Sequence, residues 1–206
     1  MLFPVLAFLG AATLIVLLPG PDTLVVVRSI LRGGRSRGTL TALGNLCGLS
    51  LWVGAAAFGL AAVLEASEAG YAALRIVGAC YLVLLGVQAW RTRGTVEAAA
   101  AGRPEQGASL LGTGFRAGLL TNLFNPKVGV FFVTFLPGFV PAGASVLWTT
   151  LLFGAIFIVL TALYWVLLLG LATRVTDWMS TPSIRRRLDA ATAAVLVAFG
   201  LRLAIE

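Results

Sequence analysis

Residues 17–24 read LLPGPDTL and interrupt an apolar stretch with two prolines, a glycine and an acid. Proline removes a backbone amide donor and clashes with the preceding turn, so a helix cannot continue unbroken through Pro19 and Pro21. In hydrocarbon the freed backbone groups need partners, and irregular backbone persists only where protein buries it or where it lines a wet cavity. Because Asp22 follows the break directly, this stretch is the first candidate for a buried polar site.

The composition of the whole chain predicts an integral membrane protein. Of its 206 residues, 59% are hydrophobic and 11% are charged, and the mean hydropathy is +0.99. Long apolar runs of this kind are typical of membrane spans. No cationic residue precedes the first run, which meets Pro19–Asp22 rather than a small-residue cleavage site. We therefore expect a retained first helix and not a signal peptide.

A bilayer core takes about 20 apolar residues per helix. On this measure we expect an all-α membrane fold with six transmembrane helices, of which the fourth crosses simply or forms a re-entrant pair. The sixth is the weakest, because it is short and carries Asp189 and Arg202 near its ends. The predicted spans are Leu2–Val27, Thr39–Leu64, Tyr71–Trp90, Gly112–Leu136, Val146–Thr173 and Leu188–Ile205.

The arginines between the spans predict the orientation. The first, third and fifth turns are rich in arginine, whereas the second and fourth contain no lysine or arginine. By the positive-inside rule the odd turns face the cytoplasm, so both termini face the periplasm of a bacterial inner membrane. This partition accounts for the isoelectric point near 10.7 without a nucleic-acid partner, since no basic stripe with interleaved aromatics occurs. The arginines are Arg28, Arg32, Arg35 and Arg37, then Arg91, Arg93 and Arg103, then Arg174, Arg185, Arg186 and Arg187.

The most polar part of the chain, residues 91–111, lies between the third and fourth spans. Its Gly, Pro, Ala and charge content predicts a cytoplasmic linker between two three-helix units, residues 1–90 and 112–206. Because three is odd, the second unit enters the membrane from the opposite side. We therefore expect two inverted repeats, an arrangement on which many transporters build alternating access.

A second break occurs where such a repeat requires one. Residues 122–129 read NLFNPKVG and interrupt the fourth apolar run, so helices 1 and 4 are both predicted to be broken. Aligning Pro21 with Pro126 sets Asp22 opposite Lys127. Broken helices at matched positions indicate a substrate site near the bilayer midplane. The candidate site residues are Pro19, Gly20, Pro21, Asp22, Asn45, Asn122, Asn125, Pro126 and Lys127.

Two interpretations of Asp22 and Lys127 remain open. An ionisable group at the membrane centre costs at least about 2.5–3.5 kcal/mol, so it pairs or performs a task. The two side chains form an ion pair that only holds the halves together, or they receive the ammonium and carboxylate of a substrate, which an amino acid carries together. If transport changes their separation, Asp22 can take up and release a proton in a chain without histidine. Asn45, in the second span, is a candidate for an interhelical hydrogen bond as well as for a ligand.

Small residues predict where helices approach closely. Gly44–Gly48 and Gly114–Gly118 are both G-x-x-x-G patterns. Cys47 and Cys80 lie in apolar runs without C-x-x-C spacing and are expected to be packing residues. With no histidine and two such cysteines, we expect no metal or other cofactor.

These pieces together resemble the lysine exporter (LysE/RhtB) superfamily. The matching stretches are PGPD at 19–22, GACYLVLLG at 78–86, NLFNPKVGVFF at 122–132 and FLPGF at 135–139, and the resemblance covers nearly the whole chain. It implies a secondary exporter, not an enzyme, for amino acids or close derivatives of the homoserine, threonine, leucine or lysine type. It also implies drive by the proton gradient and a homodimer. Many relatives have glutamine where this chain has Gly138, so a different solute preference follows if that position touches the substrate.

Other functions stay open at this point. The same scaffold serves for efflux of a cation or another small metabolite. A structural or lipid-handling membrane protein without transport is a second class, in which Asp22 and Lys127 serve packing only. A membrane enzyme finds no support, since no Ser/His, Cys/His, H-E-x-x-H or paired-carboxylate arrangement occurs.

Overall fold

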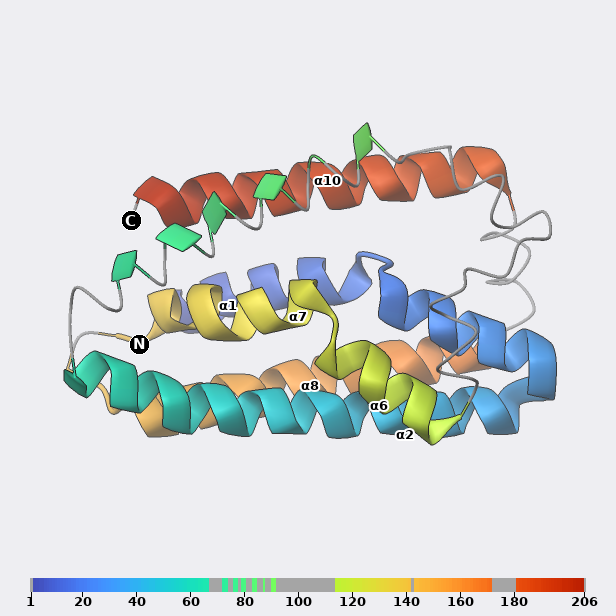
Figure 1. The fold of residues 1–206 in the computed structure, drawn as a ribbon, viewed down its shortest axis with the longest axis horizontal. Coiled ribbons are helices and arrows are strands. Elements are labelled where there is room, and N and C mark those ends of the chain that lie inside the picture. Colours follow the sequence, from blue (N-terminus) through green and yellow to red (C-terminus); the bar gives the residue numbers. More distant parts are fainter. Residues whose placement is uncertain are drawn as a thin grey trace.

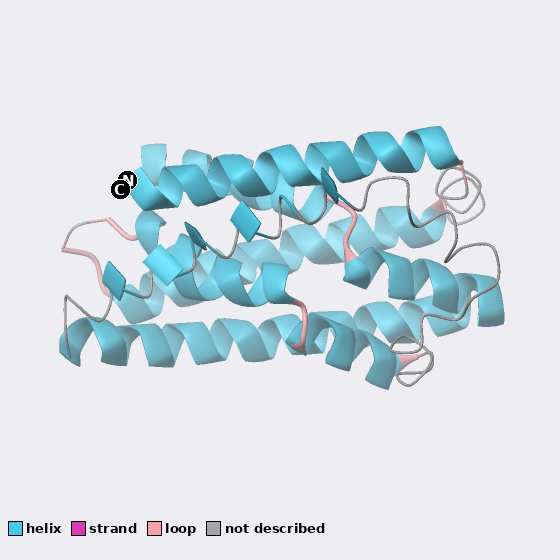
Figure 2. Ribbon diagram, turned by 45° about the horizontal axis from the view of Figure 1, so that its top comes forward, coloured by secondary structure: helices cyan, strands magenta, loops and turns pink. Residues whose placement is uncertain are grey.

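The computed structural model describes residues 2–66, 114–141, 143–171 and 181–205, together with scattered helical residues between 72 and 91. Every regular element in these ranges is a helix, and none is a strand (Figure 2). The elements are α1 (Leu2–Leu17), α2 (Pro21–Ala66), α6 (Phe115–Leu123), α7 (Pro126–Val130), the π-helical η1 (Phe131–Phe135), the 3₁₀-helical η2 (Leu136–Phe139), α8 (Val146–Gly170) and α10 (Pro182–Ile205).

Two of these helices are long and apolar enough to cross a bilayer. They are Pro21–Gly59 of α2, which includes a reversal at Gly33 and Gly34, and Val146–Gly170. A shorter apolar helix covers Pro4–Leu17. This pattern is consistent with the membrane protein that the composition predicts. The predicted third span is described only at scattered residues, and the predicted linker after Arg91 lies outside the described residues.

Helix α2 contains a sharp reversal that corrects the predicted ends of the first two spans. Its backbone leaves helical geometry at Gly33 (φ −153°, ψ 20°) and Gly34 (φ 70°, ψ −172°), and the chain turns back on itself there (Figure 1). The positive φ of Gly34 lies in the region that favours glycine. We call residues 21–32 the first arm of α2 and residues 35–66 its second arm. The arginines of the predicted first turn are therefore helical, with Arg28 and Arg32 in the first arm and Arg35 and Arg37 in the second. A helix can continue past the apolar core of a membrane.

Other predicted ends shift for the same reason. Helix α10 begins at Pro182, six residues before the predicted Leu188, with proline at the first helical position, where its missing amide costs nothing. The broken fourth segment continues as π and 3₁₀ helix to Phe139, beyond the predicted Leu136. In Figure 1 α6 and the α7–η2 segment follow one another along the bundle, as a simple broken span would.

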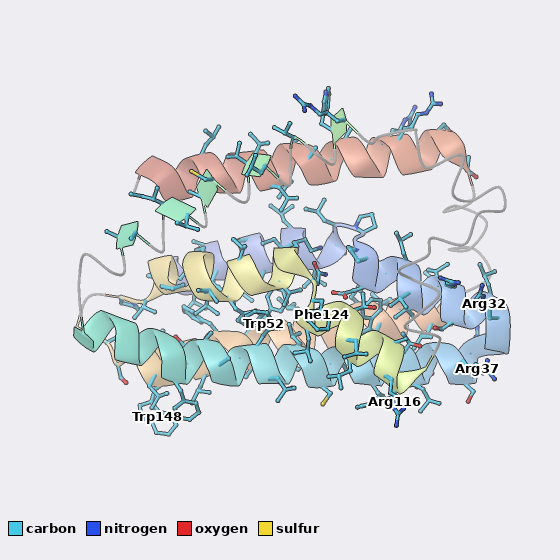
Figure 3. The ribbon with its side chains drawn as sticks, viewed as in Figure 1. Arg32, Arg37, Trp52, Arg116, Phe124 and Trp148 are labelled. Atoms are coloured by element: carbon cyan, nitrogen blue, oxygen red, sulfur yellow. The ribbon has the colours of Figure 1, made fainter. Side chains whose placement is uncertain are left out.

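Three of the arginines lie at the opposite end of the bundle from the chain termini. Figure 3 places Arg32, Arg37 and Arg116 at one end and Trp148 at the other. The start of α1 and the end of α10 lie at the Trp148 end (Figure 1). We call these the arginine end and the terminal end.

Glycines allow α6 to cross the second arm of α2 backbone to backbone. A Cβ atom added at Gly44 would overlap the Phe115 carbonyl, and one added at Gly118 would overlap the Thr41 carbonyl. The close approach predicted from the two G-x-x-x-G patterns is therefore confirmed.

Two apolar clusters lie inside the bundle, the first among α1, α2, α7, η1, η2, α8 and α10 and the second between α2 and α8. The first, which we call the aromatic cluster, includes Phe8 stacked on Phe153 with ring centroids 4.4 Å apart, and Phe131 tilted against Phe157 at 4.8 Å. The second lies nearer the arginine end, since its α8 members are about two to four turns further along that helix than those of the first. Its buried members are Val26, Val27, Ala42, Trp165 and Leu168.

Candidate functional site

The break between α1 and α2 lacks the backbone N–H groups of Pro19 and Pro21, which would continue the helix. In a continuous helix the Ile15 carbonyl would accept from the amide of residue 19, but Pro19 has no N–H. The Lys127 ammonium takes this place, because Nζ donates to the Ile15 oxygen at 3.2 Å and to the Leu18 oxygen at 3.0 Å. A cation at a helix C-terminus also meets the negative end of the helix dipole. Lys127 thus completes a helix end that lies more than a hundred residues earlier in the chain.

The break between α6 and α7 is capped by its own residues. Asn125 occupies the N-cap of α7, and its Oδ1 accepts from the Lys127 amide at 3.1 Å. Pro126 takes the first helical position, where no partner is required for its nitrogen. The amides of Phe124 and Asn125 donate to the Leu120 and Asn122 carbonyls.

Hydrogen bonds between side chains join the two breaks across the bundle. Asp22, in the first turn of α2, accepts at Oδ2 from Asn125 Nδ2 at 2.8 Å and from Asn122 Nδ2 at 3.3 Å. The segments predicted to meet do therefore meet. In the described part of the chain no hydrogen bond or ion pair joins Asp22 directly to Lys127. Each charge is instead held by neutral groups of the opposite break.

A cavity of about 40 Å³ lies at this crossing, with room for about three water molecules. Four of its lining residues carry charged or amide groups, namely Asp22, Asn45, Asn122 and Lys127, and others carry hydroxyl or indole groups, namely Thr23, Thr161, Tyr164 and Trp165. Apolar side chains complete the wall, among them Ile15, Leu49, Val128 and Phe157. Phe157 belongs to the aromatic cluster and Trp165 to the second cluster, so the cavity lies between the two.

Three buried polar atoms of the lining residues have no hydrogen-bond partner. They are the acceptors Asp22 Oδ1 and Asn122 Oδ1 and the donor Asn45 Nδ2. Asn45 and Asn122 are each 1% exposed. A buried polar atom without a partner costs about 1–3 kcal/mol, so such atoms are expected where a ligand or water completes them.

The structure divides the predicted site residues into three groups. Gly20, Asp22, Asn45, Asn122 and Lys127 line the cavity, and Asn125 contacts Asp22 without being among the lining residues. Pro19, Pro21 and Pro126 set the backbone of the breaks. Gly138 is exposed in η2 and is not among the described lining residues, so nothing here links that departure to solute preference.

Sequence reasoning missed the part of the wall that α8 contributes. Tyr164 Oη lies 3.2 Å from Thr23 Oγ1, and Trp165 Nε1 donates to Asn45 Oδ1 at 3.1 Å. The fifth span gives no signal for this face, because it is apolar on all sides.

A second tryptophan, Trp52 of the second arm of α2, lies beside the α6–α7 break, which Phe124 marks in Figure 3. Its Nε1 donates to the Asn122 carbonyl at 3.4 Å.

In the described residues no group of three or more His, Cys, Asp or Glu side chains lies together as a metal site would require.

Comparisons with known proteins agree with this picture. The family model described as LysE type translocator matches residues 3–206. An uncharacterized membrane protein of Pseudomonas aeruginosa is 33% identical over 92% of this chain and 89% of its own. A threonine efflux protein of Escherichia coli is 29% identical over 91% of each chain, and a homoserine/homoserine lactone efflux protein of Salmonella typhi is 26% identical over 96% of this chain and 94% of its own.

No solved structure matches the chain. The family model covers nearly all of the sequence, and several relatives are membrane proteins that are named for the efflux of amino acids or their derivatives. The chain therefore belongs to the LysE type translocator family, a family of membrane transporters.

Proposed function

We propose that the chain is a proton-coupled exporter of amino acids or close derivatives in the inner membrane of a bacterium. The observation that carries this proposal is the cavity at the crossed breaks. It presents two unpartnered acceptors, one unpartnered donor and a lysine between two apolar clusters. The ammonium of an amino acid is a donor, and its carboxylate is an acceptor, so a zwitterion satisfies all of these groups at once.

The proposal includes six spans arranged as two inverted repeats. Packing of the described helices supports it, because α1 contacts α8 while α6 contacts α2, so the first half of each broken helix packs on the long helix of the other unit. The alignment of Pro21 with Pro126 also sets Asn45 opposite Thr150. Both side chains are buried, and each has a polar atom without a partner.

Alternating access follows from the position of the cavity. At about 40 Å³ it is too small for an amino acid, and its lining includes Phe157 of the aromatic cluster and Trp165 of the second cluster. We propose that the units rock about the crossing, so that the cavity widens and the two clusters open one at a time. The aromatic cluster then forms the periplasmic barrier, because the arginine end faces the cytoplasm.

Proton coupling is assigned to Asp22. Asp22 lines the cavity, its Oδ1 has no partner, and its Oδ2 accepts from two asparagines of the other unit. If rocking withdraws Asn122 and Asn125, the carboxylate loses both donors and takes up a proton, which it releases when they return. Side-chain hydroxyls of Thr23, Thr161 and Tyr164 in the wall suit a hydroxylated substrate, such as those for which the threonine and homoserine relatives are named.

The test uses the full chain in proteoliposomes with an imposed pH gradient and a panel of labelled amino acids that includes L-threonine, L-homoserine, L-leucine and L-lysine. We expect concentrative transport of at least one, abolished by dissipating the gradient. Asp22→Asn should lose gradient-driven accumulation and keep substrate exchange. If Asp22→Asn keeps full gradient-driven accumulation, the coupling role is wrong.

Orientation and assembly are tested separately. In a background with Cys47 and Cys80 replaced, a cysteine at position 206 should react with an external reagent and one at position 99 should not. The reverse labelling would contradict the periplasmic termini and the inverted repeats together. The proposal also includes a homodimer, as the family resemblance implies, and the mass of the protein in nanodiscs checks it.

A further inference from the structure

We infer that Trp52 is a positioning residue for the transport site, because it fixes the shape of the α6–α7 break from which Asn122, Asn125 and Lys127 reach the first break. The effect on substrate rests on the proposed amino-acid transport, whereas the shape of the break does not.

The Trp52 indole contacts both sides of the break, beside which it lies in Figure 3. Before the break, its Nε1 donates to the Asn122 carbonyl at 3.4 Å. A continuous helix would fill this acceptor with the amide of residue 126, which Pro126 lacks, and the Asn125 amide also donates to it. After the break, the ring lies on Gly129, where an added Cβ would be 2.9 Å from Cη2 and 3.0 Å from Cζ2 of the indole. Because the indole is rigid, the two contacts fix the Asn122 carbonyl relative to Gly129.

The second arm of α2 holds the indole in place. Gly44, Gly48 and Trp52 follow one another at intervals of four residues and therefore share a face. A Cβ added at Gly44 would overlap the Phe115 carbonyl, and one added at Gly48 would lie 2.9 Å from Asn122 Oδ1. The same face thus packs on α6 at two successive turns and reaches α7 at the third. The ring also packs against the aromatic cluster, which restricts its movement.

Three polar side chains that reach the first break come from the segment between these two contacts. Asn122 and Asn125 donate to Asp22, and Lys127 donates to the carbonyls at the end of α1. Trp52 is not among the described lining residues of the cavity, so it acts on the site through this segment. Binding groups must be held to within about 0.5 Å by the residues behind them, and the indole supplies such support.

The first experiment measures the shape of the break in the ligand-free full chain in nanodiscs. Spin labels are attached at Arg116→Cys and Gly138→Cys, which lie at exposed positions of α6 and η2, before and after the break. Cys47 and Cys80 are replaced, and double electron–electron resonance gives the distance between the labels.

Gly129→Ala should change that distance. The added methyl group displaces the ring, and the rigid indole carries Nε1 away from a carbonyl at which 3.4 Å is already a long hydrogen bond. Trp52→Phe removes the donor and the outer ring edge, and it should also shift or broaden the distance distribution. The two changes combined should deviate from wild type no more than Trp52→Phe alone, because the smaller ring leaves room for the methyl group. Gly54→Ala is the matched control, since its Cβ meets nothing within 4 Å on the same arm.

The second experiment measures export in proteoliposomes with whichever of L-threonine, L-homoserine, L-leucine and L-lysine the wild type exports fastest. Gly129→Ala should raise KM about 10-fold and change the maximal rate of substrate exchange by less than about 3-fold, because Asn122 and Lys127 move in the cavity wall. Gly54→Ala should change neither. A purely structural role would instead lower the unfolding midpoint and the amount of active protein while KM stays the same.

Three results would overturn the inference. They are a label distance in Gly129→Ala equal to that in wild type, a double variant that deviates as much as Gly129→Ala and Trp52→Phe added together, and an unchanged KM in a variant whose label distance has changed. If Gly129→Ala alone does not fold, a folded double variant supports the inference and an unfolded one contradicts it. If wild type exports none of the four amino acids, the proposed function fails, while the label distances still decide what Trp52 does to the break.

Discussion

The two helix breaks differ in where their hydrogen bonds come from. The α6–α7 break is satisfied locally, by the Asn125 cap and by amides that donate within four residues. The α1–α2 break contains two prolines and takes its main donor, Lys127, from the other unit. Asp22, which follows it, also takes its described partners from the other unit.

This difference assigns unequal roles to the two breaks. A break that caps itself keeps its shape when its surroundings move, whereas a break that is completed by distant side chains changes partners whenever those side chains withdraw. The packing before each break agrees, because α6 lies backbone to backbone on α2 at Gly118, while Gly10 of α1 has open space around it. We expect α6, α7 and the second arm of α2 to act as the fixed frame, and α1 with the first arm of α2 to act as the part that responds.

The largest effect is expected from alanine in the helix before the fixed break. At Gly118 a Cβ would overlap the Thr41 carbonyl, so Gly118→Ala should separate α6 from α2 and cost more than about 3 kcal/mol. Gly10→Ala meets nothing within 4 Å and should leave stability unchanged or raise it by up to about 1 kcal/mol. Yield of monodisperse protein and its unfolding midpoint measure both. Equal sensitivity at the two glycines would remove the distinction between frame and responsive part.

Removing the lysine should damage the α1–α2 break. Lys127→Met keeps the length of the side chain but leaves the Ile15 and Leu18 carbonyls without their donor, at about 1–3 kcal/mol each. We expect a lower unfolding midpoint and loss of transport. Arg116→Met, which removes an exposed cation at the arginine end, is the control and should change stability by less than about 0.5 kcal/mol. A Lys127→Met protein as stable as wild type would show that the first break also satisfies itself.

A smaller effect is expected at the cap of α7. Asn125→Ala removes the bond to the Lys127 amide and should cost about 0.5–2 kcal/mol. Asn125→Ser retains a capping oxygen but loses the donor to Asp22. Stability should therefore recover in the serine variant while gradient-driven accumulation stays impaired. Recovery of both would mean that Asn125 serves only the cap.

The smallest effect is expected at Gly20. A Cβ there would lie 3.4 Å from Lys127 Nζ, which is ordinary contact, and this glycine is not among those with positive φ. Gly20→Ala should shift stability by less than about 0.5 kcal/mol. Gly20→Val adds two methyl groups beside the ammonium and should weaken transport more than stability. A severe loss in the alanine variant would show that the break tolerates less change than its distances imply.

The sequence predicted the breaks but not the bonds that complete them. Proline, glycine and the asparagine cap act locally, so Pro19, Pro21 and Asn125 mark both positions from their own chemistry. The partners of Lys127 are backbone carbonyls, which every residue carries. The sequence therefore could not single them out, and it predicted Asp22 as the partner of Lys127 because the two side chains carry opposite charges.

Helix α8 shows a second limit. Thr161, Tyr164 and Trp165 lie in a span that is apolar on all sides, so the pattern indicates a helix without showing which face meets the cavity. Pro137 and Gly138 mark the end of the regular helix from their own chemistry, but the π-helical turn from Phe131 to Phe135 has no such signal.

The aromatic cluster has an electrical consequence for the proposed exporter. Close-packed phenyl rings such as Phe8 and Phe153 exclude water and ions, so the transmembrane voltage falls largely across that dry layer. A zwitterion carries no net charge through it, whereas each proton that moves inward carries one, worth about 2.3 kcal/mol per 100 mV. Exchange of substrate for substrate is then insensitive to voltage, while net export against a concentration gradient depends on it, and the two modes can be separated with a potassium diffusion potential alone.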